Sequence, residues 1–352
     1  MSNKHDLDSQ HIHSAFQGVR RENLLSCFSA LCERAPMTRA ELAAATDLSI
    51  MTTGKIADAM TEAGVLIEQK QPSACVGRRP GTLRFNDTPL FLILNVSSRR
   101  FTAHVLSPAM TGKTICMHDY NDIFPFDDNL LIFLNAVKRS CNTSKEAIFY
   151  LAVITAPQDD KRQCITRAMP ISPRSEQHML DYIARIMHRT CDLVLDEISA
   201  TQYYFNSLSA FKNVDCGAYI SLSDMTYATV WMRGNLLSPR VCRIGELMLP
   251  ERKRIADALA DAHYTEDATE PVAYAIGSLD TFFSPDTVVL ESSRFRINEV
   301  FLEGVYRELS RIQPFEGRII PLHIAEAEPS AAICGCGGEL RRKWFYDLAG
   351  LE

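Results

Sequence analysis

The hydrophobic positions near the start of the chain repeat as they do in short helices. Five apolar residues return at three- and four-residue intervals and share one helix face: Leu24, Leu25, Phe28, Leu31 and Cys32. Ala35-Pro36 ends this helix, because the residue before a proline disfavours the helical conformation. The pattern predicts a first helix that starts after Arg20-Arg21.

Capping residues bound the next two predicted helices. Thr38 is followed by Glu41, which predicts a capping box in which each side chain accepts a hydrogen bond from the other residue's N–H. Asp47 suits the turn, since aspartate tolerates a left-handed conformation. Ser49 is expected to cap a third helix that runs to about Ala63, with a glycine directly after its end.

A basic segment between two apolar stretches completes this N-terminal module. Residues 65–70 and 81–85 are predicted to form antiparallel strands, and Arg78 and Arg79 lie between them in Val-Gly-Arg-Arg-Pro-Gly. Three helices followed by a two-stranded wing with a basic tip are the outline of a winged helix-turn-helix. We therefore predict a DNA-binding domain at residues 20–86.

The third helix is expected to enter the DNA major groove with its N-terminal residues at the base edges. The residues at its start are Ser49, Ile50, Met51, Thr52 and Lys55. Apolar side chains suit a thymine methyl group, and lysine suits phosphate or guanine. Phosphate contacts that position the module are expected from Arg20, Arg21 and Arg39. The wing residues Arg78 and Arg79 are expected to enter the minor groove. The alternative is a helical domain whose basic side chains are ordinary solvated surface.

From about residue 89 the pattern changes to apolar runs that alternate with helical segments. Continuous apolar runs typical of buried strands lie at residues 90–96, 148–154 and 218–222. Helical spacing appears at residues 177–188. This alternation predicts an α/β body with two lobes, at residues 87–212 and 213–352. A C-terminal helix is able to return to the first lobe or to the head.

Composition and charge narrow the classes of function. The 352 residues carry a net charge of −6, with ten Lys/Arg against nine Asp/Glu in residues 1–86 and 27 against 34 in the rest. A near-neutral head on an acidic body argues against a chain that coats nucleic acid but allows a local basic face. The 11 scattered cysteines favour reduced thiols in a cytoplasmic protein. No apolar run can span a membrane, and the polar residues 1–19 lack the centre of a secretion signal.

Four short motifs of the head belong together: Arg20-Arg21-Glu22-Asn23-Leu24, Met37-Thr38-Arg39-Ala40-Glu41-Leu42-Ala43, Thr46-Asp47-Leu48-Ser49 and Gly77-Arg78-Arg79-Pro80. They resemble the DNA-binding head of the ROK family, which comprises repressors, open reading frames and kinases and includes xylose and N-acetylglucosamine repressors. The resemblance implies an actin-like, hexokinase-like body. It also implies a transcriptional regulator, a repressor by analogy, that binds a palindromic operator on double-stranded DNA as a homodimer or dimer of dimers. A sugar or sugar derivative is the implied effector.

The motifs that a sugar kinase of this family needs are replaced. The first phosphate loop reads Asn95-Val96-Ser97-Ser98-Arg99-Arg100, without glycine. The second reads Ser223-Asp224-Met225-Thr226-Tyr227-Ala228, where side chains block the approach of phosphate. Glu291-Ser292 stand where the family has two glycines. We therefore expect no enzyme activity, no catalytic residue and no ATP or other cofactor. An active sugar kinase with a DNA-binding head and a ligand-independent DNA-binding scaffold are the alternatives.

Three charged residues stand at positions that the resemblance assigns to ligands. Glu197 replaces the catalytic aspartate, Arg243 a sugar-binding glutamate and Glu246 a zinc-binding histidine. We take these three as candidate effector ligands. Their charges suit a neutral sugar poorly. A cationic ligand, a phosphorylated ligand and the absence of any ligand all stay open. The plain alternative for Glu197 is a carboxylate in the first turn of a helix. Cys334-Gly-Cys336 lies too far downstream to complete a zinc site, so no metal is expected.

Overall fold

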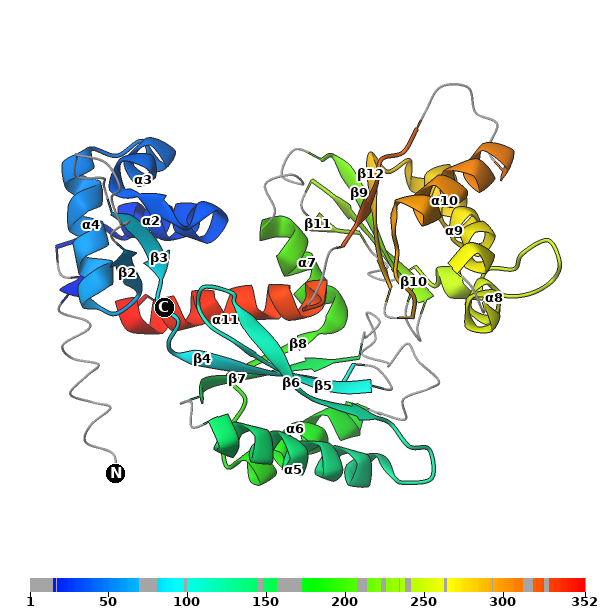
Figure 1. The fold of residues 1–352 in the computed structure, drawn as a ribbon, viewed down its shortest axis with the longest axis horizontal. Coiled ribbons are helices and arrows are strands. Elements are labelled where there is room, and N and C mark those ends of the chain that lie inside the picture. The colour runs from blue at the N-terminus through cyan, green and yellow to red at the C-terminus, as the bar shows by residue number, and fades with distance from the viewer. Residues whose placement is uncertain are drawn as a thin grey trace, which may run out of the picture.

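The structure is a computed structural model. It describes residues 15–16, 18–69, 81–97, 100–144, 148–156, 173–207, 214–222, 226–233, 235–237, 242–262, 265–292, 294–312, 319–325 and 329–351. These residues form an N-terminal head and two α/β lobes, and a long helix runs from the head to the junction of the lobes (Figure 1).

The head is a three-helix domain completed by a small sheet. Its helices are α2 (Arg21–Arg34), α3 (Arg39–Thr46) and α4 (Ile50–Glu62), and its strands are β1 (Met37–Thr38), β2 (Leu66–Gln69) and β3 (Thr82–Phe85). The strands pair antiparallel in the order β1-β3-β2. The predicted helix-turn-helix with a two-stranded wing is confirmed. Sequence patterns do not predict β1, because two residues are too few to show an alternation.

The predicted helix caps also form. The hydroxyl of Thr38 accepts a hydrogen bond from the Glu41 N–H, and the Thr38 N–H donates to the Glu41 carboxylate at 2.6 Å. Asp47 adopts the left-handed conformation with φ 53°. The Ser49 hydroxyl oxygen accepts from the Thr52 N–H at 3.1 Å. These side chains satisfy N–H groups that a helix leaves free at its start, so the turn between α3 and α4 is well defined.

The first lobe is a five-stranded mixed sheet. Its strands are β4 (Leu90–Asn95), β5 (Arg100–Leu106), β6 (Gly112–Asp119), β7 (Ile148–Thr155) and β8 (Leu193–Asp196), in the order β6-β5-β4-β7-β8. The chain from β4 to β6 is an antiparallel meander, whereas β7 and β8 join in parallel. Parallel strands need crossover helices, which explains the helical segments that separate them in sequence.

Alternate residues of β4 point to opposite layers of helices. Leu92 and Leu94 pack with α5 (Phe126–Ser144) and α6 (Pro173–Met187) on one face. Phe91 and Ile93 pack toward α7 (Glu197–Ser207) and α11 (Ala331–Ala349) on the other. Both faces of the sheet are therefore covered (Figure 1), which is why the strand is a continuous apolar run rather than an alternating one.

The second lobe repeats this plan. Its strands are β9 (Cys216–Leu222), β10 (Thr226–Met232), β11 (Asn235–Leu236), β12 (Thr287–Ser292) and β13 (Leu322–Ile324), in the order β11-β10-β9-β12-β13. Its helices are α8 (Ile255–Asp261), α9 (Thr269–Phe283) and α10 (Glu299–Ile312), with the 3-10 turns η2 (Ile244–Glu246) and η3 (Thr265–Ala268). Ala218 and Ile220 of β9 pack toward α9 and α10, whereas Tyr219 points toward α7.

The far end of α11 is buried in the head. The ring of Phe345 stacks on Phe28 of α2, with centroids 3.9 Å apart and planes within 3°. Phe16 meets the same ring edge-on, and the Arg341 guanidinium lies 4.9 Å from the centroid of the Phe85 ring in β3. Aromatic contacts of this kind add to the burial of apolar area, so α11 completes the hydrophobic core of the head.

The near end of α11 packs closely on α7. A Cβ atom at Gly335 would lie 1.8 Å from the carbonyl oxygen of Ala200. Only glycine allows the two helix backbones to approach this closely. The position of α11 on the first lobe therefore depends on this residue.

Gly335→Ala should destabilise the protein, because the added methyl group forces the two helices apart, at a cost of about 1–3 kcal/mol. A Cβ atom at Gly338 of the same helix would meet nothing within 4 Å. Gly338→Ala is the matched control and should stabilise α11 by up to about 1 kcal/mol through helix propensity. Thermal unfolding of both variants measures the difference. Equal shifts in Tm would contradict the close approach of α11 and α7.

Candidate functional site

The start of α4 presents large apolar side chains to solvent. Ile50 is 68% exposed and Met51 74% exposed, and Lys55 one turn further on is also exposed. The opposite face of the helix, with Ile56 and Met60, is buried in the head. In Figure 1, α4 lies on the side of the head away from the second lobe. Two apolar groups and a cation are thus displayed where a recognition helix would meet base edges.

The polar residues Ser49 and Thr52 at the start of α4 make hydrogen bonds within the helix. The hydroxyls of Ser49 and Thr52 lie 2.9 Å apart, and Ser49 also caps the helix. Arg20 and Arg21 are exposed at the start of α2. Their predicted contacts with DNA stay predictions.

Arg39, a predicted phosphate contact, is held by contacts within the head. Its Nη2 atom lies 2.7 Å from the Asp58 carboxylate and 3.0 Å from that of Glu68, and Nη1 donates to the Gly54 carbonyl at 3.2 Å. Two carboxylates accompany this guanidinium, and its predicted phosphate contact stays a prediction. Arg39 ties α3 to α4 and β2 with charge-assisted hydrogen bonds.

The basic tip of the wing lies outside the described residues. β2 ends at Gln69, and the description resumes at Gly81. Arg78 and Arg79 therefore stay predicted minor-groove contacts. Ser98-Arg99 and Ser223-Asp224-Met225 of the two loops that replace phosphate-binding loops also lie outside it.

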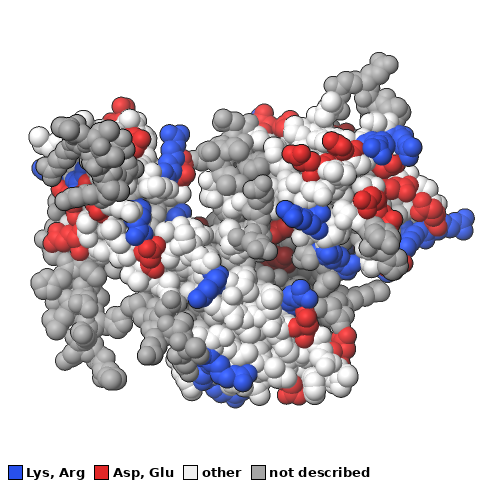
Figure 2. All heavy atoms as spheres, in the orientation of Figure 1, with Lys and Arg blue, Asp and Glu red and all other residues white. Residues whose placement is uncertain are grey.

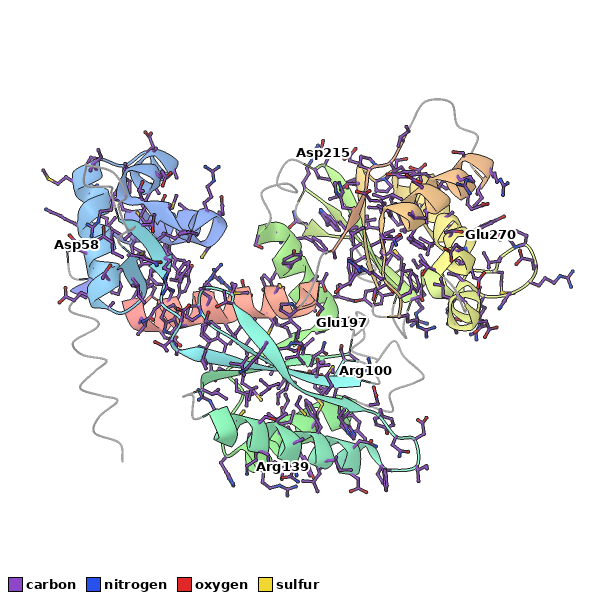
Figure 3. The ribbon with its side chains drawn as sticks, viewed as in Figure 1. Asp58, Arg100, Arg139, Glu197, Asp215 and Glu270 are labelled. Atoms are coloured by element: carbon purple, nitrogen blue, oxygen red, sulfur yellow. The ribbon has the colours of Figure 1, made fainter. Side chains whose placement is uncertain are left out.

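Two carboxyl groups meet at the junction of the lobes. Glu197 begins α7 on the first-lobe side, and Figure 3 shows it between the two lobes. On the second-lobe side, the strand register places Tyr227, Ser221 and Glu291 in one row across β10, β9 and β12. Residues in such a row point to the same face of a sheet, and Tyr219, two positions from Ser221, shares that face. This is the face that packs toward α7.

Hydrogen bonds hold Glu291 in this cluster. The Tyr219 hydroxyl donates to its Oε2 atom at 2.6 Å, and the N–H of Ala331, the first residue of α11, donates to Oε1 at 3.2 Å. The buried Tyr227 hydroxyl makes no well-formed hydrogen bond, although it lies near enough to Glu197 to lower the pKa of that carboxyl. The carboxylate of the neighbouring Asp196 accepts from the N–H and hydroxyl of Ser199, and its charge adds to the rise in the pKa of Glu197.

The charge state of Glu197 follows from its surroundings. Burial and, next, the negative charge of Glu291 raise its pKa to about 7, and hydrogen bonding to Ser97 only partly offsets this. Burial also raises the pKa of Glu291, against the opposing effect of Tyr219 and Ala331. Near neutral pH, the enclosed Glu197 carboxyl is therefore protonated in some molecules and ionised in others.

The other two candidate effector residues lie on a separate segment. Arg243 directly precedes η2, Glu246 is the last residue of η2, and both are exposed. Glu246 pairs with Arg254 at 3.2 Å. Among the contacts of the described residues, none joins Arg243 or Glu246 to Glu197. Sequence reasoning missed Glu291 as its neighbour, although the replacement of glycine by glutamate at the end of a buried strand was the available signal.

The described ranges contain neither a cluster of metal-binding side chains nor a helix suited to cross a membrane. No three His, Cys, Asp or Glu side chains there are arranged to hold a metal ion. Cys334 and Cys336 both lie in the first turn and a half of α11, where Cys336 is buried. None of the helices in these ranges combines the length and the apolar character needed to cross a bilayer.

Comparison with known proteins identifies structural relatives only. No protein-family model matches the chain, and no curated protein matches it in sequence. A ROK family transcriptional regulator, a homologue of the E. coli MLC protein, superposes with a TM-score of 0.60 over 93% of this chain and 96% of that one, at 13% identity. A ROK family glucokinase from Streptomyces griseus, in complex with glucose and AMPPNP, has a TM-score of 0.53 over 72% of this chain and 100% of that one, at 11% identity. An inorganic polyphosphate/ATP-glucomannokinase from Arthrobacter sp. strain KM has a TM-score of 0.51 over 73% and 100%, at 11% identity.

The chain therefore has the fold of ROK family transcriptional regulators. The predicted α/β class, with a winged helix-turn-helix on a two-lobed, actin-like body, is confirmed. The two kinases cover a smaller share of the chain than the regulator does, as expected for proteins without a counterpart to the head. At these identities the fold is shared, and the activity has to be argued from the residues of the site.

Glu197→Gln should make stability less dependent on pH. The pKa of Glu197 is about 7 in the folded protein, against an ordinary value of 4.5. The folded state therefore binds this proton more tightly than the unfolded state, and its stability falls as pH rises from 4.5 to 7. The amide carries no charge at any pH and should make the protein more stable than wild type at pH 8, by up to about 3 kcal/mol. Thermal unfolding from pH 5 to pH 8 measures this.

The matched control is Glu270→Gln, which removes an exposed carboxylate from α9 of the second lobe. It should leave the pH dependence of Tm as in wild type. If Glu197→Gln and wild type lose stability in parallel as pH rises, the raised pKa of Glu197 is wrong.

Proposed function

We propose that the protein is a DNA-binding transcriptional regulator of the ROK type. The observation that carries this proposal is the helix-turn-helix of α3 and α4, both capped by side chains at their N-termini, in which α4 exposes Ile50, Met51 and Lys55 to solvent. Such a surface has no role in the packing of the head. It has the composition that recognition helices use for thymine methyl groups and phosphates.

The bound form is proposed to be a homodimer or a dimer of dimers. Helix-turn-helix proteins bind two half-sites that are one helical turn apart or a multiple of it, and operator symmetry mirrors that of the protein. The two-lobed body supplies the dimer contacts in this proposal, and repression is the proposed outcome of operator binding.

The body is proposed to bind an effector without catalysing phosphoryl transfer. Glu291 and Glu197 place two carboxyl groups on facing sides of the junction between the lobes, and negative charge repels phosphate. An active sugar kinase is the second candidate, because the body superposes on a glucokinase with a TM-score of 0.53. Turnover of ATP in the presence of glucose would establish that candidate.

Effector binding is proposed to reach the head through α11. Its first residue, Ala331, donates a hydrogen bond to Glu291, and its residue Phe345 stacks on Phe28 of the head. One rigid element therefore touches both the interlobe cluster and the DNA-binding domain. A ligand that prefers one position of α11 would shift the head by its difference in affinity for the two positions.

Selection from random DNA sequences tests the proposed function. The purified full chain should enrich a palindrome whose half-sites are centred about 10 bp or a multiple of that apart. Sequencing of the selected pool at low salt measures this. Recovery of no preferred sequence would overturn the proposal, and recovery of a single half-site would overturn the dimer.

Lys55→Ala should weaken binding to the selected operator and reduce the slope of log K against log salt by about 1, because one phosphate contact is lost. The matched control is Lys113→Ala, which removes an exposed lysine from β6 of the first lobe. It should leave both affinity and slope as in wild type. Fluorescence anisotropy at several salt concentrations measures both quantities, and equal effects of the two variants would rule out α4 as the contact helix.

A further inference from the structure

The junction between the lobes holds two largely enclosed carboxyl groups, those of Glu197 and Glu291. The groups around Glu197 and Glu291 are hydroxyls and a backbone N–H, and among the described residues neither carboxyl has a Lys, Arg or His partner. Buried charges in proteins are normally paired or bind a cation, so two enclosed carboxyl groups without a basic partner are candidates for binding one.

A second observation at the same place is an unused hydroxyl group. Tyr227 is only 3% exposed, yet its hydroxyl has no well-formed hydrogen bond. Buried hydroxyl groups nearly always have a partner. The strand register directs Tyr227 to the same face as Ser221 and Glu291, so the unused hydroxyl points into the cluster rather than away from it.

The cluster is accessible from solvent. Glu197 and Glu291 both keep a small accessible surface, although protein encloses most of each side chain. The space-filling view shows a recess between the two lobes with acidic side-chain atoms in it (Figure 2), and Figure 3 places Glu197 at that junction. Glu197 comes from the first-lobe side of this junction and Glu291 from the second.

We propose that this recess binds a small molecule that carries a protonated primary amine. The ammonium group lies between Glu197 and Glu291 and donates its third hydrogen bond to the hydroxyl oxygen of Tyr227. An ammonium group has three donors and no acceptor, which matches two carboxylates and a hydroxyl. Anionic ligands such as phosphates are disfavoured, since both carboxylates repel them.

This assignment names the ligand class for the proposed effector site and rests on the proposed function only for its regulatory consequence. Amine binding is measured on the full chain without DNA. A protein that binds an amine but no operator would contradict only the proposed function. A protein that binds an operator but no amine would contradict only this inference.

The test compares amines that stay protonated at pH 8 with neutral molecules of nearly the same shape: ethanolamine against ethylene glycol, and 1-amino-2-propanol against 1,2-propanediol. Thermal unfolding and isothermal titration calorimetry at pH 8 measure binding. At least one amine should raise Tm in a saturable way by about 2 °C or more, while its neutral partner does not. If no amine exceeds its neutral partner, the proposal is overturned.

The acidic variants locate the binding. Glu197→Gln and Glu291→Gln should each weaken amine binding by about tenfold or more, because each leaves the buried ammonium with one carboxylate. Glu270→Gln on α9 should bind the amine as wild type does. Amine binding that survives both Glu→Gln substitutions would overturn the site.

The pH dependence of wild type provides a test that needs no variant. The titratable groups that face Glu197 are Glu291, Asp196, Tyr219 and Tyr227. Below its pKa, Glu197 carries a proton that the ammonium group must displace, so affinity should rise about tenfold between pH 6 and pH 8. A flat profile would mean that the bound amine does not meet this carboxyl group and would overturn the proposal.

Discussion

The packing of α11 against two different partners is the constraint on which the arrangement depends. At one end a glycine lets its backbone touch α7, and at the other an aromatic ring is inserted into the head. A helix of this length spans about 28 Å. A change in the angle of α11 at the lobes cannot be absorbed locally, because the stacked rings of Phe345 and Phe28 fix the other end. The head is therefore part of the same packed unit as the first lobe rather than an appendage on a linker.

The two lobes share a plan with sugar kinases but differ from them in the chemistry of the junction. A kinase brings backbone N–H groups close to phosphates and needs glycine there. In this chain, carboxyl and phenol groups fill the same kind of space between the lobes, and one of the carboxyls is tied to the start of α11. The two halves face each other as in a kinase, and in this chain the carboxyl groups on those faces repel anions.

Local patterns in the sequence predicted most of the head, and contacts between distant residues decided the rest. Thr38 and Ser49 act on residues three positions away, so their caps are visible in the sequence. The ion pair of Arg39 with Glu68 was not visible in the sequence, because Glu68 lies 29 residues along the chain. The meeting of Glu197 with Glu291 and of Phe28 with Phe345 follows from the folding of the body, which periodicity within a window of residues does not describe.

The aromatic contact between Phe28 and Phe345 also orders events during synthesis. The two residues are more than 300 positions apart, and chains are made at about 5–20 residues per second. Phe28 therefore emerges from the ribosome many seconds before the ring that covers it. During this interval the nascent head has an apolar face without its partner, and it gains its complete core only when both lobes have been translated. The first domain made thus waits for α11, which links the maturation of the head to completion of the body.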